Sequence, residues 1–127
     1  MKTAKDFLDT ANAAVPRITS EEAVTRFGKD DGIWIDVRDS RDIAKSGTIR
    51  GAYHVARGFI EFAADPASPF HKDFMKPDGK DYLVCGAGGQ AALAGKTLKD
   101  MGYKDVTNVG GLADWKYAGG PTQEVES

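Results

Sequence analysis

The sequence predicts a single α/β domain built on a central parallel sheet of about five strands, with helices on both faces. Three observations predict this fold class. Short apolar segments of strand length alternate along the chain with segments of helical periodicity, which favours parallel strands joined by helices. A length of 127 residues fits one compact domain. Hydrophobic residues make up 41% of the chain and charged residues 28%, which is typical of a globular protein.

The first half of the chain contains two predicted helices before its first strand. Apolar residues at helical spacing between Phe7 and Val15 predict a helix, which Pro16 ends. Thr19 and Glu22 form the pattern of a capping box at the start of a second helix. The sequence then predicts a strand over 33–37, a short helix over 39–45, a strand over 52–55, helical structure over 58–64 and a loop over 65–80.

The second half of the chain places a cysteine at the end of a strand. The predicted strand over 81–85 ends at Cys85 and runs directly into Gly86-Ala87-Gly88-Gly89. A well-patterned helix follows, and Gly102 ends it. The remaining predictions are a strand over 105–109, a turn over 110–111 and a helix over 112–117. Because ligands bind beyond the carboxyl ends of parallel strands, Cys85 lies at the expected binding edge of the sheet.

The domain organisation predicted from these elements is one domain over residues 1–127. Its core carries an N-terminal helical extension over about 1–17, and a flexible polar tail is expected over about 119–127.

Composition excludes several classes of function. A net charge of -2, with lysines and arginines scattered among acidic residues, does not predict a nucleic-acid surface. A single cysteine cannot form an internal disulfide, and the two histidines and the cysteine do not have the spacing of a metal site. No apolar run reaches the length of a signal peptide or of a membrane span. We therefore expect a cytoplasmic protein that binds neither membrane nor nucleic acid.

The loop after Cys85 has the features of an anion-binding nest. Glycines allow successive N–H groups to turn inward, and the following helix adds its unpaired N–H groups and the positive end of its dipole. A thiolate is stabilised in such a place and acts as a nucleophile without a dedicated base. Two other interpretations are a small buried hydrophobic cysteine and a phosphate-binding turn. The loop lacks the Lys-Ser/Thr of a P-loop and does not fit GxGxxG.

Four segments of the sequence resemble the motifs of the rhodanese-like domain. They are Asp36-Val37-Arg38-Asp39, Gly47-Thr48-Ile49-Arg50-Gly51-Ala52, Leu83-Val84-Cys85-Gly86-Ala87-Gly88-Gly89-Gln90, and Val109-Gly110-Gly111-Leu112-Ala113-Asp114-Trp115. The family forms are DVRE, GHIPGA, a YC-x-x-G-x-R loop and a GG-x-x-x-W ending. The resemblance covers roughly residues 18–118 in the same order.

This resemblance implies a sulfurtransferase. Cys85 would take the outer sulfur of thiosulfate or a persulfide and become a persulfide, and an external thiol or cyanide would then remove that sulfur. The negative charge of the transferred sulfur would be held by the backbone amides of Gly86, Ala87, Gly88, Gly89, Gln90 and Ala91. The family chemistry needs no metal or organic cofactor. The resemblance leaves a protein acceptor unidentified.

Departures from the family motifs bear on the donor. Gln90 stands where single-domain members often have arginine, so the loop contains no cationic side chain and we expect weaker transfer from thiosulfate than from a persulfide. Arg57 is expected either to reach the loop as a substitute cation or to pair with Glu61. The resemblance implies that Asp36 and Arg38 brace the site structurally.

Two alternative functions remain. A related phosphatase or arsenate reductase loop has an arginine six positions after the cysteine, where this chain has Ala91. A catalytically weak or silent rhodanese-like module for partner binding or for redox or sulfur sensing is the other alternative, because the loop cation is absent. The retained cysteine and glycines favour catalysis over this second alternative.

Overall fold

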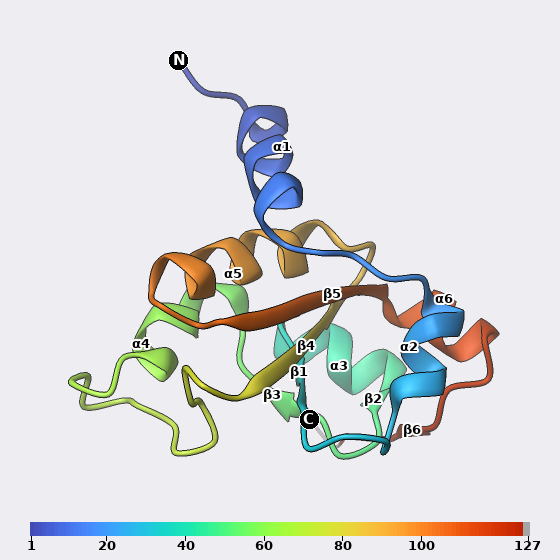
Figure 1. The fold of residues 1–127 in the computed structure, drawn as a ribbon. Helices are drawn as coiled ribbons and strands as arrows, with labels where there is room; N and C mark the ends of the chain where they lie inside the picture. The colour runs from blue at the N-terminus through green and yellow to red at the C-terminus, as the bar shows by residue number, and fades with distance from the viewer. Residues whose placement is uncertain (126–127) are drawn as a thin grey trace.

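A computed structural model of the protein, which describes residues 1–125, has the predicted α/β fold (Figure 1). The central sheet has four parallel strands in the order β3-β1-β4-β5. These strands are β1 (Ile33–Asp36), β3 (Tyr53–His54), β4 (Lys80–Cys85) and β5 (Asp105–Gly111). The sheet is one strand smaller than the expected five. Next to β5, the described segment before the second helix does not form a strand and makes only an isolated parallel bridge, between Arg17 and Asn108.

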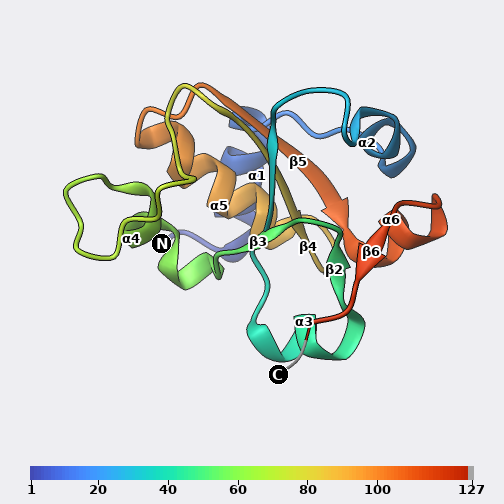
Figure 2. The ribbon, with the colours of Figure 1, turned by 90° about the horizontal axis from the view of Figure 1, so that it is seen from below.

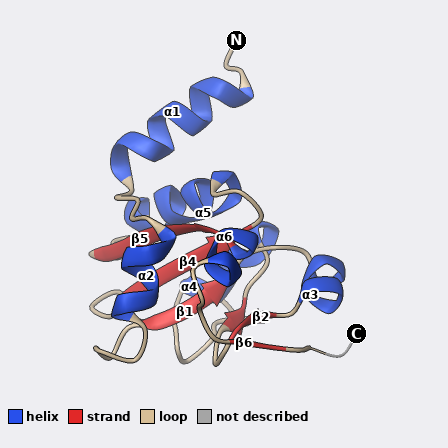
Figure 3. Cartoon of the chain, turned by 90° about the vertical axis from the view of Figure 1, so that its right-hand side faces the viewer, coloured by secondary structure: helices blue, strands red, loops and turns tan. Residues whose placement is uncertain are grey.

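The helices occupy both faces of this sheet, as predicted (Figure 3). They are α1 (Ala4–Ala14), α2 (Ser20–Arg26), α3 (Ser40–Ser46), the 3-10 turn η1 (Arg57–Phe59), α4 (Ile60–Ala64), α5 (Gly89–Asp100) and α6 (Leu112–Tyr117). Helices α4 and α5 pack on one face, and α2 and α6 pack on the other. Helix α1 lies beyond α5 and packs on its outer side (Figure 1).

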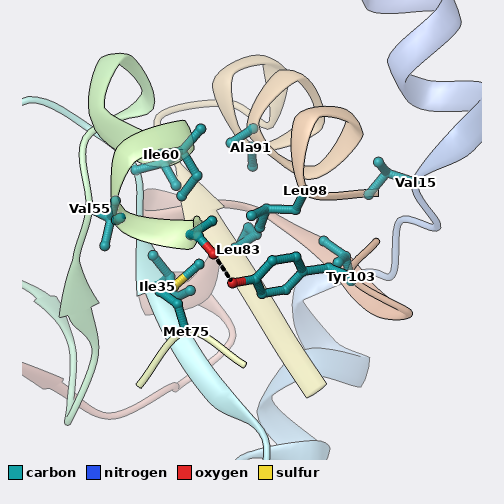
Figure 4. Packing of buried hydrophobic residues seen from close by; sticks show 14 of the residues in the cluster. Val15, Ile35, Val55, Ile60, Met75, Leu83, Ala91, Leu98 and Tyr103 are labelled. Atoms are coloured by element: carbon teal, nitrogen blue, oxygen red, sulfur yellow. Dashed lines mark hydrogen bonds between the residues drawn. The ribbon is translucent and has the colours of Figure 1, made fainter. Parts of the chain in front are cut away.

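Alternation along the strands divides the buried side chains into two cores. On the α5 side, Ile35, Leu83 and Cys85 pack with residues of α4 and α5, and Figure 4 shows part of this cluster. On the α6 side the core is aromatic, and Trp34 stacks on Tyr82 with ring centroids 4.3 Å apart. Strand β4 is therefore covered on both faces, which places its carboxyl end rigidly.

The helix ends follow local side-chain chemistry. Thr19 accepts a hydrogen bond from the Glu22 backbone N–H at 3.1 Å and caps α2, but the reciprocal bond of the predicted capping box is not among the described bonds. A full capping box, with its reciprocal bond, occurs at α1 between Thr3 and Asp6. Gly102 follows α5 with a φ of +95°, the left-handed conformation expected of a glycine that ends a helix.

The segment after α6 differs from the flexible tail expected over about 119–127. Residues Thr122–Gln123 form β6, which pairs antiparallel with β2 (Thr48–Ile49) in a separate two-stranded sheet (Figure 2). The Pro121 carbonyl accepts hydrogen bonds from Trp115 Nε1 and from the Arg50 backbone N–H. Backbone groups at the edge of the core thus gain partners, which explains the ordered path through residue 125. Residues 126–127 of the expected tail lie outside the described part of the chain.

Within residues 1–125, the helices are too short or too polar for any of them to cross a lipid bilayer.

Candidate active site

Cys85 is the last residue of β4, at the carboxyl edge of the sheet. Its Sγ accepts hydrogen bonds from the backbone N–H of Gly88 at 3.0 Å and from that of Ala91 at 3.3 Å. Only 1% of Cys85 is exposed, while Gly86, Ala87 and Gln90 are exposed around it. A sulfur anion at this position is therefore met by two N–H dipoles and by the first turn of α5.

The glycines of the loop have specific conformational reasons. Gly88 has a φ of +104° and is the N-cap of the 12-residue helix α5, so the chain turns there in the left-handed region. Gly111 lies so close to Gly86 that an added Cβ would overlap the Gly86 carbonyl oxygen. The ends of β4 and β5 can therefore approach each other. This brings Gly88-Gly89 and Gly110-Gly111 to the same edge of the sheet.

Asn108 supports this loop from β5, and it was not among the predicted site residues. It is completely buried, its Nδ2 donates to the Gly88 carbonyl at 2.8 Å, and its Oδ1 accepts from the Gly110 N–H at 2.8 Å. One amide side chain thus ties the backbone of the cysteine loop to the end of β5. A polar residue in the middle of a buried strand is the signal that could have identified it.

Arg17 is a second residue of the site that sequence reasoning missed. Its Nη2 donates to the Ala87 carbonyl at 3.2 Å, and its guanidinium lies directly against Gly88 and Gly110. Arg17 is positioned by its bridge to Asn108, where Pro16 and Ile18 bond to the same strand residue. The cysteine loop has no cation in its own sequence, but the fold brings one from 70 residues earlier in the chain.

Of the two expectations for Arg57, the described contacts show the pairing with Glu61 and no hydrogen bond to the cysteine loop. The Arg57 guanidinium contacts Glu61 at 3.3 Å and Thr97 Oγ1 at 3.1 Å, in the second half of α5. The assignment of Arg57 as a substrate-binding residue is therefore not supported by the contacts it makes. Helix α5 packs against both η1 and α4, and Arg57 uses this contact to reach Thr97, eight residues after the start of α5 at Gly89.

Asp36 and Arg38 form a buried ion pair on the face of β1 opposite to Cys85. Arg38 Nη2 lies 2.8 Å from Asp36 Oδ2, and Thr48 Oγ1 donates to the same oxygen at 2.8 Å. Arg38 also donates to the Gly47 carbonyl at 2.8 Å. This network ties the end of β1 to the end of α3 and to β2, without a contact to the sulfur among the bonds described.

A cavity of about 660 Å³ lies between α3 and β3, on the side of the sheet away from Cys85. Its walls include Arg41, Ile43, Tyr53 and His54, and Asp36 contributes to its floor. The Asp36 carboxylate is already occupied by Arg38 and Thr48, so it offers this cavity no free acid or base. We therefore take the cysteine loop, and not this cavity, as the candidate active site.

Known protein families and curated proteins include relatives of this chain. Residues 19–118 match the family model described as the rhodanese-like domain. YrkF of Bacillus subtilis (strain 168), named provisionally as a sulfur carrier protein, is 28% identical over 105 residues, covering 81% of this chain and 52% of YrkF. The thiosulfate sulfurtransferase PspE of Escherichia coli (strain K12) is 32% identical over 81 residues, covering 64% and 71% of the two chains. The chain thus spans about half the length of YrkF.

Solved structures show the same architecture. RPA3614 of Rhodopseudomonas palustris CGA009, described as a protein of unknown function and possible tyrosine phosphatase, superimposes with a TM-score of 0.92 at 37% identity, over 97% of this chain and 96% of that one. The polysulfide-sulfur transferase homodimer of Wolinella succinogenes has a TM-score of 0.75 at 26% identity, over 95% and 87%. Since the family model covers nearly all of the folded core, including the cysteine loop, this chain belongs to the rhodanese-like domain family.

Proposed function

We propose that the protein is a sulfurtransferase that carries a sulfane sulfur on Cys85. The observation that carries the proposal is the pair of backbone N–H groups, from Gly88 and Ala91, that point at Sγ. A thiol that served only as a small hydrophobic core residue would need no such donors. The names of PspE and of the Wolinella protein describe sulfur transfer, which supports the same chemistry.

The first half-reaction balances without an added oxidant. The Cys85 thiolate attacks the outer sulfur of thiosulfate, a new S–S bond forms on Sγ, and the S–S bond of thiosulfate breaks to release sulfite. The enzyme is left as a persulfide anion. With a small persulfide as donor, the same attack releases the donor's thiolate. In the second half-reaction, cyanide or an external thiolate takes the outer sulfur and restores the Cys85 thiolate.

The beginning of α5 can stabilise the outer sulfur of this persulfide. The first intrahelical bond of α5 runs from the Ala92 N–H to the Gly88 carbonyl, so the N–H groups of Gly89 and Gln90 precede the helical ladder. With Gly88 and Ala91 already directed at Sγ, the loop supplies a cluster of donors to an anion one bond farther out. Backbone N–H groups stabilise an anion by hydrogen bonding and do not transfer a proton. This suits sulfur transfer, in which the protein's negative charge stays on sulfur.

Phosphate ester hydrolysis is disfavoured by the residue six positions after the cysteine. Ala91 is buried and has no charge, so a phosphate dianion would lack a guanidinium clamp inside the loop. The description of RPA3614 makes this alternative worth measuring directly. We expect no hydrolysis of an aryl phosphate under conditions in which sulfur transfer is observed.

The proposal is tested by the mass of the intact protein. After incubation with thiosulfate, or separately with a small persulfide, the protein should gain about 32 Da, the mass of one sulfur atom, on Cys85. Cys85→Ser keeps the size of the side chain and should gain nothing. A catalytically silent module would show no adduct with either donor, and that outcome would overturn the proposal.

A further inference from the structure

Arg17 is a cation at the cysteine loop with no acidic partner of its own. The ion pairs of residues 1–125 involve other lysines and arginines, and Arg17 is in none of them. Its one described side-chain hydrogen bond goes to the Ala87 carbonyl, which leaves the full positive charge of the guanidinium uncompensated. Two acidic residues, Glu21 and Asp114, line the same cavity as Arg17, and neither forms an ion pair with it.

Gly88 connects this charge to the reacting sulfur. Its N–H donates to Cys85 Sγ at 3.0 Å, while the position of its missing Cβ is filled by the Arg17 guanidinium. Backbone bond lengths then place the guanidinium within roughly 8 Å of Sγ. This is no longer than the screening length of physiological salt, so the two charges interact.

The guanidinium is also open to solvent. Arg17 is exposed and lines a cavity of about 500 Å³ together with Ser20, Gly110 and Tyr117. The bridge to Asn108 holds its backbone on the sheet, so the charge stays beside the loop when an anion arrives. Arg17 is thus held in place, charged and accessible to solvent beside the cysteine loop.

We propose that Arg17 is the specificity-determining residue for anionic sulfur donors. It takes the place of the arginine that the loop lacks at Gln90, and attracts donors that carry negative charge on the group that leaves. When thiosulfate is the donor, the S–S bond to the SO₃ group breaks and both electrons of that bond leave with sulfite, whose charge Arg17 stabilises. The proposal rests on the sulfurtransferase function for this step, but the charge effect itself is independent of it.

The transfer assay compares two donors that differ in charge. Arg17→Gln should lower kcat/KM for thiosulfate by about tenfold, because it removes one charge at this distance. It should change the rate with the persulfide of an uncharged thiol, such as mercaptoethanol, by less than about twofold. Arg17→Lys should retain most of the thiosulfate rate. The matched control is Arg26→Gln, which removes the same charge from the end of α2.

Alkylation of Cys85 separates failure of this inference from failure of the proposed function. Iodoacetate is an anion and iodoacetamide is neutral, and both alkylate a thiolate without any sulfur transfer. Arg17→Gln should lower the ratio of the iodoacetate rate to the iodoacetamide rate several-fold, and Arg26→Gln should not. In the unmodified protein, added salt should lower the same ratio, which tests the charge even if the variant folds poorly.

Equal effects of Arg17→Gln on both members of each reagent pair would show a structural role only and would overturn the inference. So would an unmodified protein whose alkylation ratio is insensitive to salt. A protein that forms no persulfide with any donor but keeps the predicted alkylation ratios would overturn the proposed function and leave the charge effect of Arg17 established.

Discussion

Gly88 is the residue at which the contacts of the cysteine loop converge. Its N–H donates to Cys85 Sγ, its carbonyl accepts from Asn108, and its Cα faces Arg17. Its φ of +104° lies in a region that residues with a Cβ rarely adopt. The contacts that Cys85, Asn108 and Arg17 make at this position therefore all depend on residue 88 being glycine.

Gly88→Ala is expected to damage the site more than a neighbouring glycine substitution. The added Cβ would be strained in the left-handed region and would overlap the guanidinium of Arg17. We expect a loss of about 1–3 kcal/mol in the free energy of unfolding, and a fall of at least tenfold in the rate of persulfide formation. Urea denaturation and intact mass spectrometry measure the two effects.

Gly86→Ala is the matched control, because Gly86 is exposed, has no positive φ and has open space where its Cβ would be. It should leave stability nearly unchanged and, because its backbone N–H is kept, lower the rate much less than Gly88→Ala does. Equal losses in the two variants would contradict the role given to Gly88.

Because residue 90 is glutamine and not arginine, the cysteine loop itself contains no cationic side chain. Gln90 is exposed on the first turn of α5, near the N–H groups that face the sulfur. Gln90→Arg adds a guanidinium there and should raise kcat/KM for thiosulfate by roughly tenfold, with a much smaller change for the persulfide of mercaptoethanol, whose leaving group carries less negative charge than sulfite. Gln90→Ala serves as the neutral control. An unchanged or lower thiosulfate rate in Gln90→Arg would refute this account of the missing loop cation.

At the scale of elements, the two ends of β4 differ, because one carries the candidate nucleophile and the other carries a buried carboxyl group. Cys85 lies at its carboxyl end, and Asp81 lies near its amino end on the same face, 1% exposed. Burial, together with the nearby charge of Asp105, raises the pKa of Asp81 to about 7, and its Oδ2 has no hydrogen-bond partner among the described residues. The strand that positions the nucleophile therefore carries a destabilising carboxylate at its other end.

This carboxyl makes the stability of the protein depend on pH. Between about pH 4 and pH 7 the folded state holds the Asp81 proton that the unfolded state has lost, so the free energy of unfolding falls as the pH rises through this range. Asp81→Asn should stabilise the protein at pH 8 by about 2–4 kcal/mol and flatten this slope. Denaturation curves at several pH values measure it.

Asp105→Asn is the control for Asp81→Asn, since Asp105 is exposed and contributes only the smaller electrostatic part of the shift. It should give a much smaller gain in stability. A wild-type free energy of unfolding that does not fall between pH 4 and pH 7 would exclude a buried, proton-holding Asp81.

The elements that sequence analysis predicted well are those with local signals. Periodicity identified the strand that ends at Cys85, and side-chain chemistry identified the Thr19 cap and the Gly102 stop. The pairing of β2 with β6 was missed because two-residue strands are too short to show a periodic pattern. The polar composition of the segment after α6 is equally typical of a flexible tail and of a short antiparallel edge strand.

The site was predicted only as far as its local part reaches. Cys85 and its glycines are consecutive in the sequence, so the nest around Sγ could be inferred from spacing. Arg17 joins them through a bridge to Asn108, a pairing across most of the chain that depends on how the segment after α1 packs on β5. Arg57, in contrast, was considered as a substitute cation for the loop, but in the structure its guanidinium donates to Thr97.

At the scale of the whole molecule, the fold brings three distant segments to one edge of the sheet. The loop after β4, the end of β5 and the segment between α1 and α2 meet around Cys85 (Figure 1). Two separate cores hold β4 from both faces, so the nest is supported by a rigid strand. The scaffold is thus suited to hold one sulfur anion in place while donors and acceptors exchange.

The fate of the isolated Cys85 adduct tests the central claim most directly. Protein loaded with thiosulfate is freed of excess donor and then mixed with cyanide, and thiocyanate and intact mass are measured together. The account predicts one thiocyanate per adduct and return of the protein to its unmodified mass, because the sulfur on Cys85 is transferable. An adduct that cyanide does not remove, or thiocyanate formed equally well by Cys85→Ser, would contradict it.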